Sequence, residues 1–167
     1  GGGCLAEIGF SDFAGSTLVH STGGAAALAG IMLLGARSGR FDSKGNPKAL
    51  QPFAASSIPL VTIGVFILWL GWFGFNGGSQ LALGTFDDAV AISTIFINTN
   101  LAACGGVLAA GAITSLMYGK TDVIQMLNGA IGGLVAITAE PLAPAPFAAI
   151  LIGAIGGLIV VFGTKLL

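Results

Sequence analysis

Charged residues are scarce in this sequence. Lys and Arg together number 6, Asp and Glu number 7, and the 167 residues include a single histidine. Soluble domains have about a quarter of their residues charged, whereas the charged fraction here is 8%. So few charges cannot cover a water-facing surface, and the basic residues form no run that could track the phosphates of a nucleic acid. The composition therefore excludes an ordinary soluble domain and predicts no nucleic-acid partner.

Cysteine is also rare. Cys4 and Cys104 lie far apart, each among small apolar residues, and neither has a second Cys or a His at metal-ligand spacing. We interpret both as packing residues and predict neither a metal site nor a cofactor. The one histidine has no Cys or Ser partner at a credible catalytic spacing, and no two carboxylates within the apolar segments could share acid-base work. The sequence therefore does not predict an enzyme.

Apolar residues are abundant. They make up 54% of the chain, and the mean hydropathy is +0.95. Charged residues separate five apolar segments, each near the length of about 20 residues that a membrane-spanning helix needs. The predicted spans cover about 13–36, 57–76, 89–119, 123–139 and 146–164. We therefore predict an all-α fold, a polytopic bundle of helices in the cell membrane.

The distribution of charge supports five spans. With five spans all basic residues fall on one side, which the positive-inside rule makes cytoplasmic; these residues are Arg37, Arg40, Lys44, Lys48, Lys120 and Lys165. The acidic residues Glu7, Asp87, Asp88 and Glu140 fall on the other side. The segment 123–139 is the shortest, but without it Lys165 would change sides.

His20 is the residue that most needs an explanation, because it lies within the first predicted span. Ionisable side chains inside a bilayer usually face a cavity, a pathway or a proton relay. The alternative is a structural imidazole bonded to a neighbouring helix. A neutral imidazole donates from one nitrogen and accepts with the other, so it can guide a polar solute or relay a proton. Asp12, about two helical turns earlier, either caps the helix or shapes a cavity mouth that favours a cation, and both roles can coexist.

A second polar group lies at the end of the second predicted span. Trp72, Phe75, Asn76 and Ser79 follow helical spacing and would share one side of a helix. Aromatic residues there can anchor a helix at the lipid headgroups. Ring faces with a hydroxyl between them can also attract a small ammonium-like ion. These residues leave both interpretations open.

The sequence contains 28 glycines, and some recur in a pattern. Residues 128–134, Asn-Gly-Ala-Ile-Gly-Gly-Leu, and 152–158, Ile-Gly-Ala-Ile-Gly-Gly-Leu, are nearly the same heptapeptide. Each contains glycines four apart, which allow helices in lipid to approach closely. We interpret them as a packing device, because no strand-turn-helix context indicates a ligand-binding glycine loop.

Two stretches resemble signatures of the Amt/Mep/Rh ammonium transporters. They are residues 12–20, Asp-Phe-Ala-Gly-Ser-Thr-Leu-Val-His, and residues 71–79, Gly-Trp-Phe-Gly-Phe-Asn-Gly-Gly-Ser. The order and spacing of both motifs match, as does the basic loop between them. The resemblance implies an eleven-helix bundle built from two inverted five-helix repeats and assembled as a homotrimer with one pore per subunit. This chain resembles the fifth to ninth spans of that fold.

The resemblance also implies roles for individual residues. His20 would be the first of two pore-lining histidines and a proton relay, and Phe75 would be one of two stacked rings that close the pore. Ser79 would accept a hydrogen bond from ammonium at the outer face, where Asp12 shapes the site and Thr138 approaches Ser79. The residues implied in ammonium recruitment are Trp72, Ser79, Asp12 and Thr138.

The sequence also departs from the family pattern. The second pore histidine and the partner phenylalanine are expected outside residues 1–167. The amino end begins with glycines rather than Met and lacks the basic region of a signal peptide, so we expect a piece of a longer chain. Ser16 stands where the motif often has glycine, and residues 139–141 read Ala-Glu-Pro. These differences concern the outer loop geometry.

The resemblance favours ammonium or ammonia transport through a histidine-lined pore. An ammonium sensor on the same scaffold, signalling to a cytoplasmic partner, is the alternative. A glycerol-type or water-type channel is disfavoured because the sequence has no Asn-Pro-Ala half-helix motif. The expected partners are ammonium or ammonia, the lipid bilayer and further copies of the chain, and a PII-type regulator is a further candidate.

Overall fold

The computed structural model describes residues 3–42, 46 and 55–166, and helices dominate them. The helices are α1 (Cys4–Glu7), the π-helix η1 (Ser16–Ser21), α2 (Thr22–Leu34), α3 (Ile58–Gly78), α4 (Phe86–Tyr118), α5 (Val123–Ile137) and α6 (Pro146–Leu166). The predicted all-α fold is confirmed. Lys44 and Lys48 of the predicted basic loop lie outside the described residues.

Four helical runs are long and apolar enough to cross a membrane, namely Ser16–Leu34, α3, α4 and α6. The helix at the fourth predicted span, α5, has only 15 residues. It is about 22 Å long, which is less than the roughly 30 Å hydrocarbon core. The helix ends at Ile137, where Glu140 N donates back to the Ile137 carbonyl at 3.1 Å and Pro141 follows, because the residue before a proline is disfavoured in the helical conformation. The described chain therefore has four full-length candidate spans and one shorter apolar helix.

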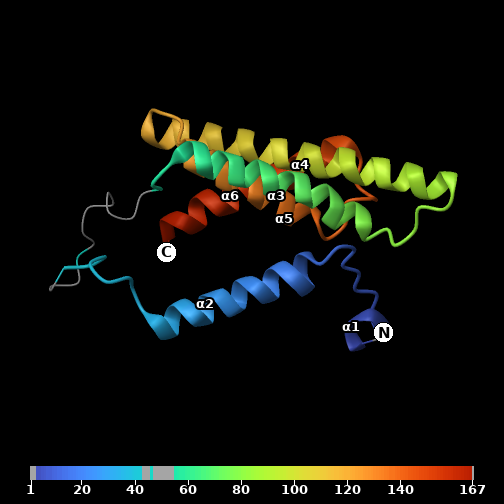
Figure 1. Ribbon diagram of the computed structural model, residues 1–167, viewed down its shortest axis with the longest axis horizontal. Helices are drawn as coiled ribbons and strands as arrows, with labels where there is room; N and C mark the ends of the chain where they lie inside the picture. The colour runs from blue at the N-terminus through green and yellow to red at the C-terminus, as the bar shows by residue number, and fades with distance from the viewer. Residues whose placement is uncertain (1–2, 43–45, 47–54, 167) are drawn as a thin grey trace.

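The helices form a packed group from which one helix is set apart (Figure 1). In this group α4, α5 and α6 pack against one another, and α3 packs against α4 and α5. The π-helix η1 contacts α5, whereas α2 lies apart from the group. The C-terminal ends of α2, α4 and α6 lie at the same end of the molecule, and these ends carry Arg37, Lys120 and Lys165.

Glycine allows α5 and α6 to approach the backbone of α4. A Cβ at any of the four motif glycines would overlap a carbonyl oxygen of α4; these glycines are Gly129, Gly133, Gly153 and Gly157. The carbonyl oxygens belong to Ala102 and Gly106. Backbones this close gain dispersion contacts that a larger side chain would prevent. The predicted packing role of the two heptapeptides is confirmed.

We expect Gly153→Ala to lower the thermal unfolding midpoint of the protein in detergent. The new methyl would meet the backbone of Ala102, which cannot move as a side chain can, and such overpacking costs about 1–3 kcal/mol. Gly163→Ala is the matched control on α6, because a methyl added at Gly163 would have no heavy atom within 4 Å. The control should keep or slightly raise the midpoint, since Ala favours a helix by about 1 kcal/mol. Equal midpoints for the two variants would contradict the packing role.

Candidate functional site

His20 contacts two aromatic rings of α3. Its imidazole stacks on the Trp72 indole, with ring centroids 5.1 Å apart and an interplanar angle of 25°. It also contacts the Phe75 ring at 5.4 Å, and the two α3 rings lie 6.0 Å from each other. Trp72 and Phe75 share a face of α3 because residues three apart on a helix are neighbours. The two predicted motifs thus meet in space, one on η1 and one on α3.

The imidazole is partly buried and opens onto a small cavity. The cavity has a volume of about 230 Å³ and is lined by His20, Ile67, Leu68, Gly71, Trp72 and Phe75. His20 Nε2 is buried and has no hydrogen-bond partner among the described residues. Most of the lining is apolar, so an ion entering it would have to give up its hydration at a cost. The site therefore combines an apolar wall with one nitrogen that can donate or accept a proton.

Thr138 fixes the indole of Trp72. The indole Nε1–H donates to Thr138 Oγ1 at 2.8 Å, and the same hydroxyl donates to the Leu134 carbonyl at 2.7 Å. Thr138 is 0% exposed. Trp72 is therefore held at its N–H by the C-terminal end of α5, while its ring faces His20.

Asp12 organises the turn that leads into η1. Its carboxylate accepts four backbone N–H groups at 2.8 to 3.2 Å, and these groups belong to residues 15–18. Gly15 has a φ of +103° and a Cβ there would overlap Val19, so the turn requires glycine. An acidic acceptor at the start of a helix also meets the positive end of its dipole. The Asp12 side chain accepts from the first free amides as predicted, but the N-cap residue of η1 is Gly15 and not Asp12. The role of Asp12 at a cavity mouth stays a prediction.

The same turn is anchored on the end of α5. Phe13 N donates to the Ala139 carbonyl at 2.7 Å, and Ala14 N donates to the Thr138 carbonyl at 3.1 Å. The Ser16 hydroxyl donates to the Val135 carbonyl at 3.0 Å. Ser16, which departs from the family motif, thus adds a hydrogen bond that glycine could not make. The end of α5 therefore positions η1 as well as Trp72.

The four α3 side chains that were expected to share one side of the helix point to different neighbours. Trp72 and Phe75 face His20, whereas the fully buried Asn76 donates from Nδ2 to Thr99 Oγ1 of α4 at 3.0 Å. Ser79 is the C-cap of α3, and its hydroxyl donates to the Phe75 carbonyl at 2.9 Å. The hydrogen bonds described for the Thr138 side chain go to Trp72 and Leu134, not to Ser79. The recruitment roles of these residues stay predictions.

The sequence interpretation missed a polar connection beside the site. Asn98 of α4 is fully buried, and its Nδ2 donates to the carbonyls of Pro141 and Pro144 at 2.9 and 2.8 Å. This amide holds the connection between α5 and α6 against α4. An amide in an apolar helix signals that a partner must exist, because a buried polar group without one is costly. The sequence alone does not identify the segment that supplies this partner, which here is the connection between α5 and α6.

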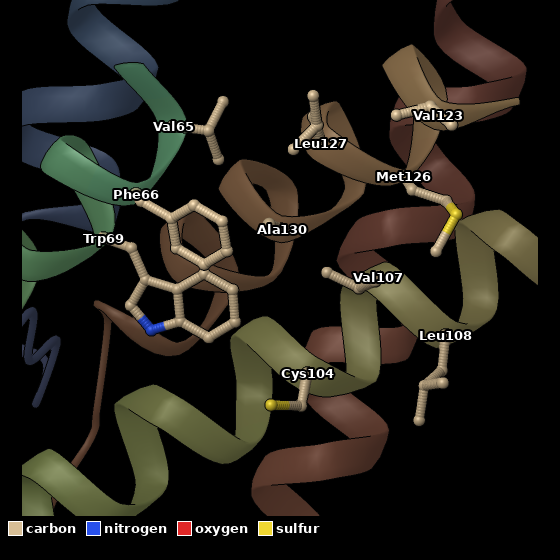
Figure 2. Close-up of a pocket in the computed structure, with 10 residues that line it drawn as sticks. All are labelled: Val65, Phe66, Trp69, Cys104, Val107, Leu108, Val123, Met126, Leu127 and Ala130. Atoms are coloured by element: carbon tan, nitrogen blue, oxygen red, sulfur yellow. The ribbon is translucent and has the colours of Figure 1, made fainter. Parts of the chain in front are cut away.

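A separate apolar cavity lies between α3, α4 and α5 (Figure 2). Its volume is about 510 Å³. Its lining includes Phe66, Trp69 and Cys104, and Phe66 and Trp69 stack with centroids 6.1 Å apart. The residues that line it carry no charge and include neither His20 nor Trp72. This cavity therefore offers no imidazole that could relay a proton.

The comparisons with known proteins agree with the two motifs. The family described as "Ammonium Transporter Family" matches residues 1–167. The chain belongs to the ammonium transporter family. The family is one of transporters rather than enzymes, and with its apolar spans the chain is part of a multi-pass membrane protein.

Its relatives include named transporters. The chain is 48% identical over 152 residues to ammonium transporter Amt2 of Archaeoglobus fulgidus, covering 91% of this chain and 31% of the relative. It is 46% identical over 170 residues to a putative ammonium transporter of Synechocystis sp., covering 100% of this chain and 37% of the relative. The chain therefore spans about a third of the length of these relatives, which agrees with a fragment of the family fold.

Solved structures of the family have the same arrangement of helices. A structure named Sensor Amt Protein matches with a TM-score of 0.85 and 36% identity, covering 97% of this chain and 38% of that chain. Mep2 of Saccharomyces cerevisiae matches with a TM-score of 0.77 and 32% identity, covering 93% of this chain and 33% of that chain. The predicted membership of the ammonium transporter fold is confirmed.

We expect Asp12→Ala to loosen the start of η1. A hydrogen bond to a charged acceptor is worth about 1.5–3 kcal/mol, and the variant removes the acceptor of four backbone amides. Hydrogen exchange at the amides of residues 15–18 should become about tenfold faster or more. The control is Asp87→Ala, because Asp87 is exposed on the first turn of α4. Unchanged exchange at residues 15–18 in Asp12→Ala would contradict the capping role.

Proposed function

We propose that the full-length protein conducts ammonium across a membrane through a pore that His20 lines. The observation that carries the proposal is the imidazole stacked beside Trp72 and Phe75, at a small apolar cavity on membrane-spanning helices. The names of the relatives, ammonium transporters of Archaeoglobus fulgidus and Synechocystis sp., support the substrate. An apolar wall with one titratable nitrogen is suited to a solute that can give up a proton.

The mechanism follows from the cost of moving charge into hydrocarbon. A bare monovalent cation is expensive there, whereas neutral ammonia crosses readily. Ammonium can leave its proton behind and pass as ammonia, with His20 carrying the proton separately. Potassium has no proton to give up and is therefore rejected. A neutral imidazole suits this role because it both donates and accepts.

The other residues are assigned to steps before the relay. Phe75, 40% exposed and in ring contact with His20, is the gate through which the solute must pass. Trp72, Ser79 and Asp12 belong to the outer region that recruits ammonium, where ring faces and oxygen acceptors favour a small cation. The family resemblance places Thr138 in the same region, where its hydroxyl accepts the Trp72 indole N–H. The protein functions as a homotrimer, with a PII-type regulator as a candidate cytoplasmic partner, both proposed from the family resemblance.

We expect His20→Ala in the full-length protein to abolish the separation of proton and ammonia. In proteoliposomes the ammonium-evoked current should fall about tenfold or more, or potassium should begin to pass, because positioned proton transfer contributes at least that factor. Met32→Ala is the control on α2, since Met32 does not line the cavity. Unchanged current together with unchanged exclusion of potassium in His20→Ala would overturn the assigned role.

A sensor function is the second candidate, and one observation favours it. The structure named Sensor Amt Protein shares the fold with a TM-score of 0.85. A sensor would bind ammonium at the same site and signal through its cytoplasmic parts. The two functions differ in flux, because a sensor need not release its ligand on the far side of the membrane.

Proteoliposomes containing only the purified full-length protein separate the two candidates. We expect an inward ammonium gradient to produce a current or a change in internal pH, since the apolar cavity favours passage of neutral ammonia over retention of a cation. The control is empty liposomes under the same gradient. Saturable ammonium binding without flux would favour the sensor.

A further inference from the structure

Residue 138 supports both sides of the ring contact at His20. Its hydroxyl accepts from the Trp72 indole at 2.8 Å, and its carbonyl accepts from Ala14 N at 3.1 Å. Ala14 belongs to the turn that begins η1 and places His20. One residue at the end of α5 thus connects the helix that carries the imidazole and the ring on which the imidazole stacks.

The Thr138 hydroxyl already has a partner for its proton, so it can only accept a hydrogen bond from Trp72. Its proton is directed to the Leu134 carbonyl at 2.7 Å, so toward Trp72 the oxygen is an acceptor only. The side chain is 0% exposed and does not line the His20 cavity. A solute in the cavity therefore meets Trp72 and His20 but not Thr138.

The indole needs this acceptor. The bond is partly buried, and an N–H removed from water without a partner loses its hydrogen bonds to water and gains nothing in return. With the acceptor in place, the N–H end of Trp72 is fixed and the ring can lie against the imidazole at 5.1 Å. Among the described helices, η1 packs on α5 as well as on α2. The end of α5 is therefore one of the contacts that position His20 relative to α3.

We propose that Thr138 is a positioning residue that fixes the Trp72 indole against His20 and so sets the orientation of the imidazole in its cavity. This proposal rests on the transport function proposed above. It differs from a role in ammonium recruitment, because Thr138 acts through Trp72 and does not touch the solute.

The test compares Thr138→Val with Thr138→Ser in the full-length protein. Val keeps the shape and the backbone carbonyl but cannot accept the indole N–H, whereas Ser keeps the hydroxyl. We expect Thr138→Val to lower the maximal ammonium flux about tenfold, the equivalent of one lost hydrogen bond. The half-saturating ammonium concentration should stay within about twofold, because contact with the solute is unchanged. Thr138→Ser should restore most of the flux.

A second readout follows the ring itself. 5-Fluorotryptophan placed at position 72 alone reports its surroundings by fluorine NMR. We expect Thr138→Val to shift or broaden this signal and Thr138→Ser to preserve it. In a Trp72→Phe background, which has no indole N–H to donate, Thr138→Val should have no further effect on flux.

Two outcomes would overturn the positioning role. One is an unchanged fluorine signal in Thr138→Val. The other is a raised half-saturating concentration with an unchanged maximal flux, which indicates direct recruitment of ammonium. Failure of the proposed function is a different result, since it is an absence of ammonium flux in the unsubstituted protein. The fluorine signal would still decide whether Thr138 positions Trp72.

Discussion

Polar groups within a bilayer have no water to bind, so they must find their partners inside the protein. This constraint explains much of the structure around His20. The Trp72 indole N–H donates to the Thr138 hydroxyl, and at the edge of the first span the Asp12 carboxylate accepts four amides. Against this background the buried Nε2 of His20 stands out, because the described residues offer it no hydrogen bond.

The site at His20 is supported by the packing of α4, α5 and α6, which is made by small apolar residues. The glycines of α5 and α6 bring these helices against the carbonyls of Ala102 and Gly106, which gives a tightly packed three-helix unit. The end of α5 then supplies the acceptors for the Asp12 turn and for Trp72. Small residues outside the cavity lining thus hold the helix whose end contacts both the Asp12 turn and Trp72.

The short length of α5 shows that an apolar segment and the helix within it need not end at the same residue. Hydropathy extends the apolar segment to residue 139, but the helix ends at Ile137. The Thr138 hydroxyl folds back on Leu134, and the chain then turns into the connection that Asn98 holds. The carbonyls of Thr138 and Ala139, which follow the helix, accept hydrogen bonds from the Asp12 turn.

The sequence by itself determined the all-α membrane fold, the positions of the apolar segments and the family. Hydrophobic length and small-residue spacing are local properties that the bilayer selects directly. The two motifs with Asp12, His20 and Trp72 are also local patterns, so the candidate residues could be named without coordinates. Only the tertiary structure decided that Thr138 binds Trp72, that Asn76 turns toward Thr99 and that Asn98 holds a distant loop. These pairings join residues far apart in the chain, and the partner of a buried polar group is set by which helices pack together.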